Sequence, residues 1–344
     1  MTAPVAQNLH CDTAPDEARA RALLTAARSA VAWGNMLEAS RLFHRAGNFF
    51  KMDQKWHDAG AAFQTAAELK MPFEADTIPA PPYTTEVRKI TSSGLLKTAS
   101  DCFVKAQDFR VAVSCLQTAA DLLAEDGDFT TAAGHCKALA QMLAPRDVDG
   151  AIRFYEKAAR LHEAAADVHG RSAGDKAWLT VGEQLARKGD YTAAIDLFEG
   201  LADRILQEPK ARDYASSGGV YVPDFSTAEP KCLTRAVLCY LCRDGPSAAQ
   251  EAVVRWDAKL PSSGFMFDQE RNVLRQVMGG AENRFTAGHI AKILQAPENA
   301  GSATASGPPW CDNDTQTRRL DKWTTMMLER ALQMLRDAEN KAQR

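Results

Sequence analysis

Two short stretches of this chain place reactive residues at spacings known from catalytic or metal sites. Residues 170–174, Gly-Arg-Ser-Ala-Gly, fit the G-x-S-x-G pattern of a hydrolase, whose serine needs a sharp strand-to-helix turn. The preceding segment, AIRFYEKAARLHEAAADVH, has a helical pattern, so a polar turn between helices is the better interpretation than a catalytic Ser172. Cys239 and Cys242 have C-x-x-C spacing, but they lie in a helical pattern without a second pair or histidines at ligand spacing.

The remaining candidates for catalysis are also weak. His135 and His162 lie on helical patterns with no legible carboxylate, histidine and nucleophile set, so we expect structural histidines. The sequence has no glycine-rich phosphate loop followed by Lys-Ser or Lys-Thr, so we do not expect nucleotide hydrolysis. We expect that the protein is not an enzyme and that it uses no cofactor or metal.

The composition favours helices. The 344 residues are 45% hydrophobic, enough to bury a core, and strand-forming residues are sparse beside Ala, Leu, Glu, Lys, Arg and Gln. We therefore predict an all-α protein that fills two ordinary domains or one elongated repeat array.

Charge and cysteine content limit the partners and the compartment. A net charge of −3 and a pI near 6.2 give no overall reason to expect nucleic acid. Eight cysteines are too dilute for a disulfide scaffold, so reduced thiols in the core are expected. No apolar run is long enough for a signal peptide near the start or for a bilayer span elsewhere. We expect a cytoplasmic protein.

A repeated template indicates how the helices are organised. A large residue at position 0 is followed by Ala at 3, usually a large residue at 7, and small or apolar residues at 10 and 11. Copies start at Met36, Trp56, Leu96, Phe109, Phe129, Val148 and Tyr191. Several starts are 19 or 20 residues apart, so each unit is one helix plus a turn, and two units make a hairpin of the tetratricopeptide (TPR) type.

The residues between copies agree with this interpretation. An Asn or Asp that can cap a new helix stands one residue before most starts, at Asn35, Asp108, Asp128, Asp147 and Asp190. Gly34, Gly127 and Gly189 stand one residue earlier, where a preceding helix can end in a left-handed conformation.

Three polar, proline-containing stretches predict long connections. They are residues 71–87, 208–230 and 295–316, and helical patterns resume after each of them. The last helices do not follow the template. We therefore expect a superhelical array of TPR-like hairpins over residues 1–257 and a C-terminal helical bundle over residues 258–344.

Several short motifs of the sequence resemble those of one protein family. NFFKMDQKWHDAGAAF, residues 48–63, is the most specific stretch, and GDFTTAAGH, DVDGAIRFYEKAA, YTAAIDLFE, RAVLCYLC and RLDKWTTMML extend the match. With these motifs the chain resembles the alpha-type soluble NSF attachment proteins, the SNAP family of membrane-fusion adaptors, over most of residues 36–335.

The resemblance implies an adaptor in vesicle-mediated and intracellular protein transport. Members of the family bind along a four-helix SNARE bundle of the syntaxin type and recruit NSF, a hexameric AAA+ ATPase, which disassembles the bundle. It also implies a cytoplasmic protein that associates peripherally with membranes, and no nucleic-acid partner.

The resemblance also suggests SNARE-facing residues. Lys51 and Lys176 match basic positions of the SNARE-facing surface. The family's lysine one turn after the second is Thr180 here, and Asp128 and Gly134 replace residues around another basic segment. Either the SNARE-facing surface is adapted to other partners, or the alignment with the family is shifted in this region.

Membrane and ATPase contacts are implied in the same way. The family's first inter-helix loop carries exposed phenylalanines, whereas SAVAWGN here is shorter and keeps one aromatic, Trp33. Trp33 is thus a candidate for weak membrane contact, with packing on the next helix as the alternative. Glu282, Asp337 and Glu339 are candidates for recruiting the ATPase. Gln343 stands where the family has a leucine that stimulates the ATPase, so binding to the ATPase is expected and its stimulation is left open.

One other function class remains open for the same fold. A generic TPR-like scaffold that binds another protein or a peptide would also explain the repeats and the lack of catalytic groups. The last helix favours the adaptor, because a generic array more often ends in a cap that keeps the repeat register.

Overall fold

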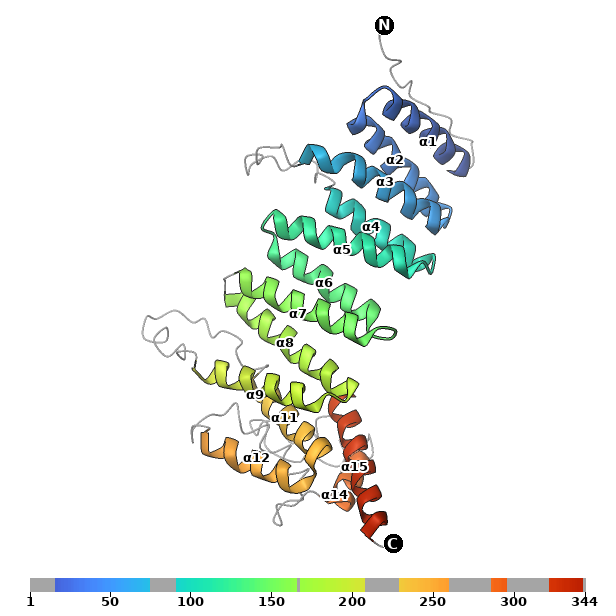
Figure 1. Ribbon diagram of the computed structural model, residues 1–344. Helices are drawn as coiled ribbons and strands as arrows, with labels where there is room; N and C mark the ends of the chain where they lie inside the picture. The colour runs from blue at the N-terminus through green and yellow to red at the C-terminus, as the bar shows by residue number, and fades with distance from the viewer. Residues whose placement is uncertain are drawn as a thin grey trace, which may run out of the picture. The chain divides into compact units, whose positions relative to one another are not determined.

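The computed structural model describes residues 16–74, 91–165, 168–207, 229–259, 286–295 and 322–342, and all regular secondary structure in these ranges is helical (Figure 1). The helices are α1 (Asp16–Ala32), α2 (Met36–Met52), α3 (Trp56–Glu74), α4 (Ser92–Lys105), α5 (Phe109–Glu125), α6 (Phe129–Leu143), α7 (Val148–Ala164), α8 (Val168–Lys188), α9 (Tyr191–Gln207), α11 (Glu229–Asp244), α12 (Pro246–Lys259), α14 (Ala287–Gln295) and α15 (Lys322–Ala342). The predicted all-α fold is confirmed.

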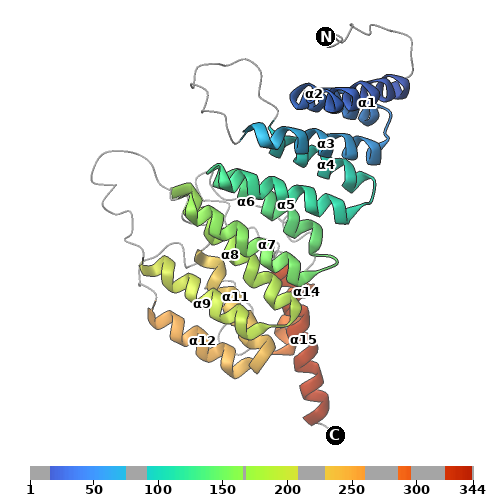
Figure 2. The same cartoon turned by 45° about the horizontal axis from the view of Figure 1, so that its top comes forward.

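The chain separates into two compact units, Met1–Gly170 and Arg171–Arg344, which we describe separately. In the first unit each helix from α1 to α7 packs against the next one along the chain (Figures 1 and 2). Consecutive helices run in opposite directions, which is the hairpin arrangement that the repeats predict.

The template predicts where most helices begin. Six of its seven starts are the first residue of a helix: Met36, Trp56, Phe109, Phe129, Val148 and Tyr191. The predicted caps form as well. The side chains of Asn35, Asp108, Asp128, Asp147 and Asp190 each accept a hydrogen bond from the backbone amide three residues later, at 2.8–3.4 Å. Each cap satisfies one of the free amides at a helix start.

Close contacts between large and small residues hold neighbouring helices together. Phe63, at position 7 of its template copy, is 1% exposed, and its ring lies against Gly47 of α2. A Cβ atom on Gly47 would lie 2.9 Å from that ring, closer than side chains tolerate. In the second unit, Phe198 of α9 packs against Gly182 of α8 in the same way. Glycine is therefore needed at both positions because only hydrogen leaves room for the ring.

The template copy at Leu96 is misplaced. Helix α4 begins at Ser92, so Leu96 lies one turn inside it. Counting back 20 residues from Phe109 moves the start of this copy to position 89, and Leu96 and Ala99 then occupy positions 7 and 10. Both are buried, at 3% and 0% exposure. The template missed this start because serine replaces alanine at position 3. The Ser92 hydroxyl donates a hydrogen bond to the carbonyl of Ala67 in α3 at 3.3 Å.

The predicted long connections also need correction at their edges. Helix α3 continues through Pro72 to Glu74, although we expected the first connection to start at residue 71. A proline this near the end of a helix removes only one backbone donor. Helix α11 begins at Glu229, inside the second expected connection, and Pro230 lies in its first turn, where proline is tolerated.

The rest of the expected connections, and the helical pattern at 267–278, lie outside the described residues. The boundary between an array ending at 257 and a bundle starting at 258 stays a prediction.

In the second unit, helix α11 packs against α9, α12 and α15, and α14 packs against α15. Trp323 of α15 is 3% exposed and meets Phe198 edge-on, with ring centroids 6.2 Å apart. Its indole nitrogen donates to the carbonyl of Glu183 at 3.2 Å. Arg330 of α15 donates to the carbonyls of Ala186 and Arg187, at 2.8 and 3.0 Å. Helix α15 thus adds hydrogen bonds to carbonyls in the last two turns of α8.

Five helix turns share one geometry. A left-handed residue donates its amide to the carbonyl three residues earlier, and the next amide donates to the carbonyl five residues earlier. The predicted residues Gly34, Gly127 and Gly189 have φ of 76°, 81° and 94°. The other two turns use Gln54 and Gln107, at 59° and 63°, and no sequence pattern predicts a left-handed residue at either position.

Replacing Ala112 with leucine should destabilise the first unit. Ala112 and Ala151 are fully buried at position 3 of their copies, and added side-chain volume there should lower the free energy of unfolding by roughly 1–3 kcal/mol. Ala61→Leu is the matched control, because Ala61 is exposed on α3. Denaturant unfolding of Ala112→Leu, Ala151→Leu and Ala61→Leu measures the effect. An equal stability of Ala112→Leu and Ala61→Leu would contradict it.

Replacing Gln107 with glycine should stabilise the chain. A left-handed L-residue costs about 1–2 kcal/mol, part of which the extra backbone freedom of unfolded glycine offsets. We expect a gain of about 1 kcal/mol for Gln107→Gly and little change for Gln107→Ala, measured by denaturant unfolding. If both variants lose stability equally, the glutamine side chain rather than the backbone decides this turn.

Candidate protein-interaction groove

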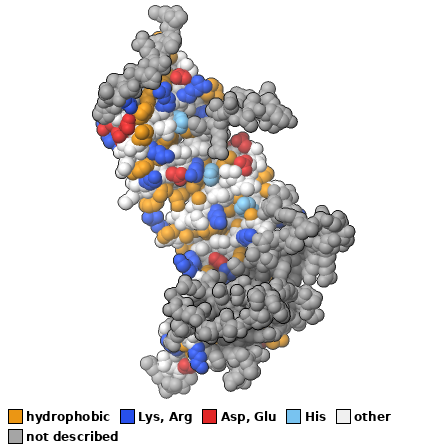
Figure 3. Space-filling view, turned by 180° about the vertical axis from the view of Figure 1, so that it is seen from behind, with side chains coloured by type: hydrophobic (Ala, Val, Ile, Leu, Met, Phe, Trp, Pro, Cys, Tyr) orange, Lys and Arg blue, Asp and Glu red, His pale blue; other side chains and the backbone are white. Residues whose placement is uncertain are grey.

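An open groove of about 770 Å³ lies on the first unit between helices α2 to α6. One side of α4, from Lys97 to Lys105, forms its centre. Lys51 at the end of α2 and Trp56 at the start of α3 line one part, and Ala138, Gln141 and Met142 of α6 line another. Figure 3 shows one face of the molecule, on which Lys and Arg side chains lie among hydrophobic ones over the described helices.

The turn between α2 and α3 places Lys51 and Trp56 at the groove. Gln54 takes the left-handed conformation, and its amide donates to the carbonyl of Lys51 at 3.2 Å. The amide of Lys55 donates to the carbonyl of Phe50 at 2.9 Å, which ends α2 sharply. Helix α3 therefore starts one residue later, with Trp56 half-buried beside the exposed Lys51.

The matching turn after α4 places Lys105. Its ammonium nitrogen lies 4.1 Å from the centre of the Trp56 ring, a cation–π contact that joins α4 to α3. Gln107, the second left-handed glutamine, follows two residues later. Both turns with a left-handed glutamine thus adjoin lysines of the groove.

The groove is basic, with one carboxylate among its lining residues. Lys97 and Asp101 form an ion pair at 2.6 Å along α4, and their side chains are 51% and 57% exposed. Such an exposed pair adds little stability. Lys51 and Lys105 take part in none of the ion pairs found among the described residues. Three lysines and one aspartate leave the groove with a positive balance that suits an acidic partner.

Two other ionisable groups near the groove carry no charge at neutral pH. Burial lowers the pKa of His135 on α6, and the charge of Lys97 lowers it further. Burial also raises the pKa of the Cys102 thiol, which lines the groove but is only 2% exposed. The lysines and Asp101 therefore set the charge of the groove.

The residues that could have done chemistry lie within helices. Ser172 is part of α8, so a helix replaces the strand-to-helix turn that a nucleophile needs. Cys239 and Cys242 are buried in α11, where burial raises the pKa of the Cys242 thiol to about 12. Among the described residues, no group of three or more His, Cys, Asp or Glu side chains could hold a metal ion.

The residues predicted as contacts fall in different places. Lys51 lies in the groove of the first unit, while Lys176 is exposed on α8 in the second unit. Trp33 follows α1 and is 67% exposed, so most of its side chain is open to solvent. Asp337 and Glu339 are exposed near the end of α15. Glu282 lies outside the described residues.

Sequence reasoning missed most of the groove. Trp56 was interpreted only as a packing residue, and Lys97, Asp101 and Lys105 were not selected at all. The four-residue spacing of Lys97 and Asp101 is a visible signal of an ion pair on a helix face. Their position beside Lys51 is not visible, because it depends on how α4 packs next to α2 and α3.

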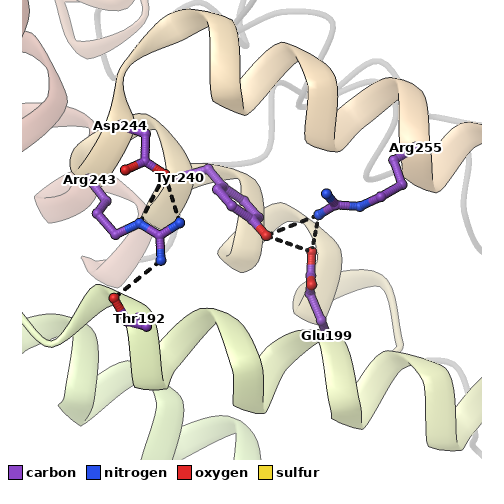
Figure 4. A network of polar contacts seen from close by, with 6 residues as sticks. All are labelled: Thr192, Glu199, Tyr240, Arg243, Asp244 and Arg255. Atoms are coloured by element: carbon purple, nitrogen blue, oxygen red, sulfur yellow. Dashed lines mark hydrogen bonds and ion pairs between the residues drawn. The ribbon is translucent and has the colours of Figure 1, made fainter.

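A second polar cluster joins α9, α11 and α12 in the second unit (Figure 4). One carboxylate oxygen of Glu199 accepts hydrogen bonds from the Tyr240 hydroxyl and the Trp256 indole, both at 3.2 Å, and pairs with Arg255. Arg243 pairs with Asp244 at 2.7 Å and reaches Thr192 of α9. These contacts fix α12 and the end of α11 against α9, which is a packing role. 

None of the described helices combines the length and the apolar character that crossing a membrane requires. 

Similar proteins agree with the resemblance found in the sequence. The chain is 25% identical over 299 residues to the alpha-soluble NSF attachment protein of Mus musculus, covering 85% of this chain and 82% of that protein. It is also 25% identical to the beta-soluble NSF attachment protein of Bos taurus, with the same two coverages.

The fold was also compared with a solved structure of a Podosopora anserina kinesin light chain with TPR-like repeats. The match covers 73% of this chain and 100% of that chain, at 14% identity and a TM-score of 0.33. That likeness is too weak to carry an argument. The model of one family, described as soluble NSF attachment protein, SNAP, matches residues 18–295, which is well over half of the sequence. The chain belongs to the soluble NSF attachment protein family.

Proposed function

We propose that this protein is an adaptor that binds SNARE complexes and recruits the hexameric AAA+ ATPase NSF for their ATP-dependent disassembly. The observation that carries the proposal is the basic groove around Lys51, on a chain whose family match spans residues 18–295. The relatives are named for attachment to NSF. As a member of an adaptor family, the chain acts by binding and not by catalysis.

The groove suggests how a SNARE bundle is held. Lys51 is exposed and has no carboxylate partner among the described residues, so an acidic side chain of the bundle can approach it without displacing another. Lys176 on α8 offers a second exposed cation. Exposed charge pairs are individually weak and screened by salt. Binding therefore depends on several contacts along a long charged rod and on several copies of the adaptor around it.

Trp33 supports a weak peripheral contact with membranes. Trp33 is 67% exposed, and Leu37, four residues later at the start of α2, is 45% exposed. Amphipathic rings such as indole favour the membrane interface. A cytoplasmic location with peripheral membrane association follows from this proposal.

Recruitment of the ATPase is assigned to acidic residues late in the chain. Asp337 and Glu339 are exposed on α15, and Asp337 accepts a hydrogen bond from Gln333 at 2.9 Å. Glu282 is proposed with them on the resemblance alone. 

A generic TPR-like scaffold for another protein or peptide is the alternative function. A basic groove between repeats would serve such a scaffold equally well. The family match favours the SNARE adaptor, and binding to a SNARE bundle separates the two functions.

Reconstitution tests the adaptor function. The protein, a syntaxin-type SNARE bundle and NSF from one source are combined, and SNARE disassembly is followed with and without ATP. We expect disassembly that requires all three components and ATP. If the protein neither bridges the bundle to NSF nor supports disassembly, the adaptor function is wrong.

Charge reversal tests the two proposed SNARE-facing lysines within that system. Lys51→Glu and Lys176→Glu should each weaken SNARE binding by about five- to tenfold at low salt, because attraction becomes repulsion, and added salt should reduce the difference. Arg45→Glu is the control, since Arg45 is exposed on α2 but does not line the groove. A variant that binds as tightly as the control identifies a lysine outside the interface.

Removing the indole tests the membrane contact. Trp33→Ser should lower co-flotation with vesicles of mixed neutral and acidic lipids by about threefold or more, because it removes exposed apolar area that a membrane can cover. Val254→Ser is the control, since Val254 is 63% exposed on α12 of the second unit. Equal flotation of both variants would exclude Trp33 as a membrane contact.

A further inference from the structure

The three lysines of the groove are not equivalent. Lys51 has no carboxylate partner among the described residues, and Lys105 is held over the Trp56 ring at 4.1 Å. Lys97 is already paired with Asp101 at 2.6 Å. Asp101 is therefore the one acidic residue in the lining of a groove whose other charges are positive.

The position of Asp101 makes it a competitor of any acidic partner. It stands four residues after Lys97 on the same face of α4, so its carboxylate reaches the ammonium group without help from another helix. Both side chains are about half exposed, which leaves the pair open to solvent and to a binding partner. A carboxylate that approaches Lys97 must displace Asp101 and is repelled by it.

We propose that Asp101 is a specificity-determining residue that lowers the affinity of the groove for acidic helical partners. The inference rests on the proposed function, in which the groove receives the acidic side of a SNARE bundle. Asp101 then acts as an internal counter-charge. Partners with enough negative charge to reach Lys51 and Lys105 together still bind, while weakly acidic helices are excluded.

A purely structural role for Asp101 makes a different prediction. If the pair with Lys97 only supports helix α4, removing the carboxylate lowers stability and leaves SNARE affinity unchanged or weaker. The charge role predicts tighter binding, and the gain must fade as salt screens the groove.

The test compares Asp101→Asn with Asp121→Asn. Asp121 of α5 also pairs with a lysine, Lys157 of α7, but it does not line the groove. Because each variant replaces one aspartate with asparagine, both change the net charge equally. Binding of the full-length variants to the SNARE bundle is measured at low and high salt, together with their thermal unfolding. We expect Asp101→Asn to bind about two- to fivefold tighter than Asp121→Asn at low salt, in line with the strength of exposed pairs.

A double-mutant cycle with Lys97→Ala locates the effect. Lys97→Ala should change affinity little in the native chain, where Asp101 neutralises Lys97, and should weaken it clearly in the Asp101→Asn background. Equal affinities of Asp101→Asn and Asp121→Asn, or no coupling to Lys97, would overturn the proposal.

Lys51→Glu separates this outcome from a failure of the proposed function. If Lys51→Glu weakens binding while Asp101→Asn does not tighten it, the groove is the interface and only the role of Asp101 is wrong. If neither variant changes SNARE binding, the groove is not the interface and both proposals fail there.

Discussion

The fold depends on how closely consecutive helices can approach. Large side chains at one template position enter spaces left by small ones, as Phe63 does against Gly47 and Phe198 does against Gly182. The buried alanines, such as Ala112, keep the same distance short elsewhere. Because helix packing is dense, these contacts fix which face of each helix is covered and which stays free for partners.

Much of the fold could be predicted because its signals are local. Caps such as Asp128 and turns such as Gly127 mark helix boundaries through the chemistry of one or two residues. The prediction was wrong at Leu96, where a serine in place of alanine hid the true register. Gln54 and Gln107 were missed because the hydrogen bonds of these turns need a left-handed residue, a conformation that glutamine itself disfavours.

The groove was predictable only in part. Lys51 was selected through the family resemblance, and its exposure agrees with a contact role. Lys97, Asp101 and Lys105 come from a helix 46 to 54 residues further along the chain, and no local pattern ties them to Lys51. The net charge of a groove depends on which residues packing brings together. A sequence shows each charged residue but not which of them share a groove.

The contact between α15 and α8 has a mechanical consequence. Arg330 donates hydrogen bonds to two carbonyls near the end of α8, and the buried Trp323 donates one to a carbonyl of the same helix. A pull along α15 would therefore load hydrogen bonds and buried aromatic area together, in parallel and not one after another. Elements coupled in this way resist a pull better than either contact would alone, because the load is shared between the hydrogen bonds and the buried ring.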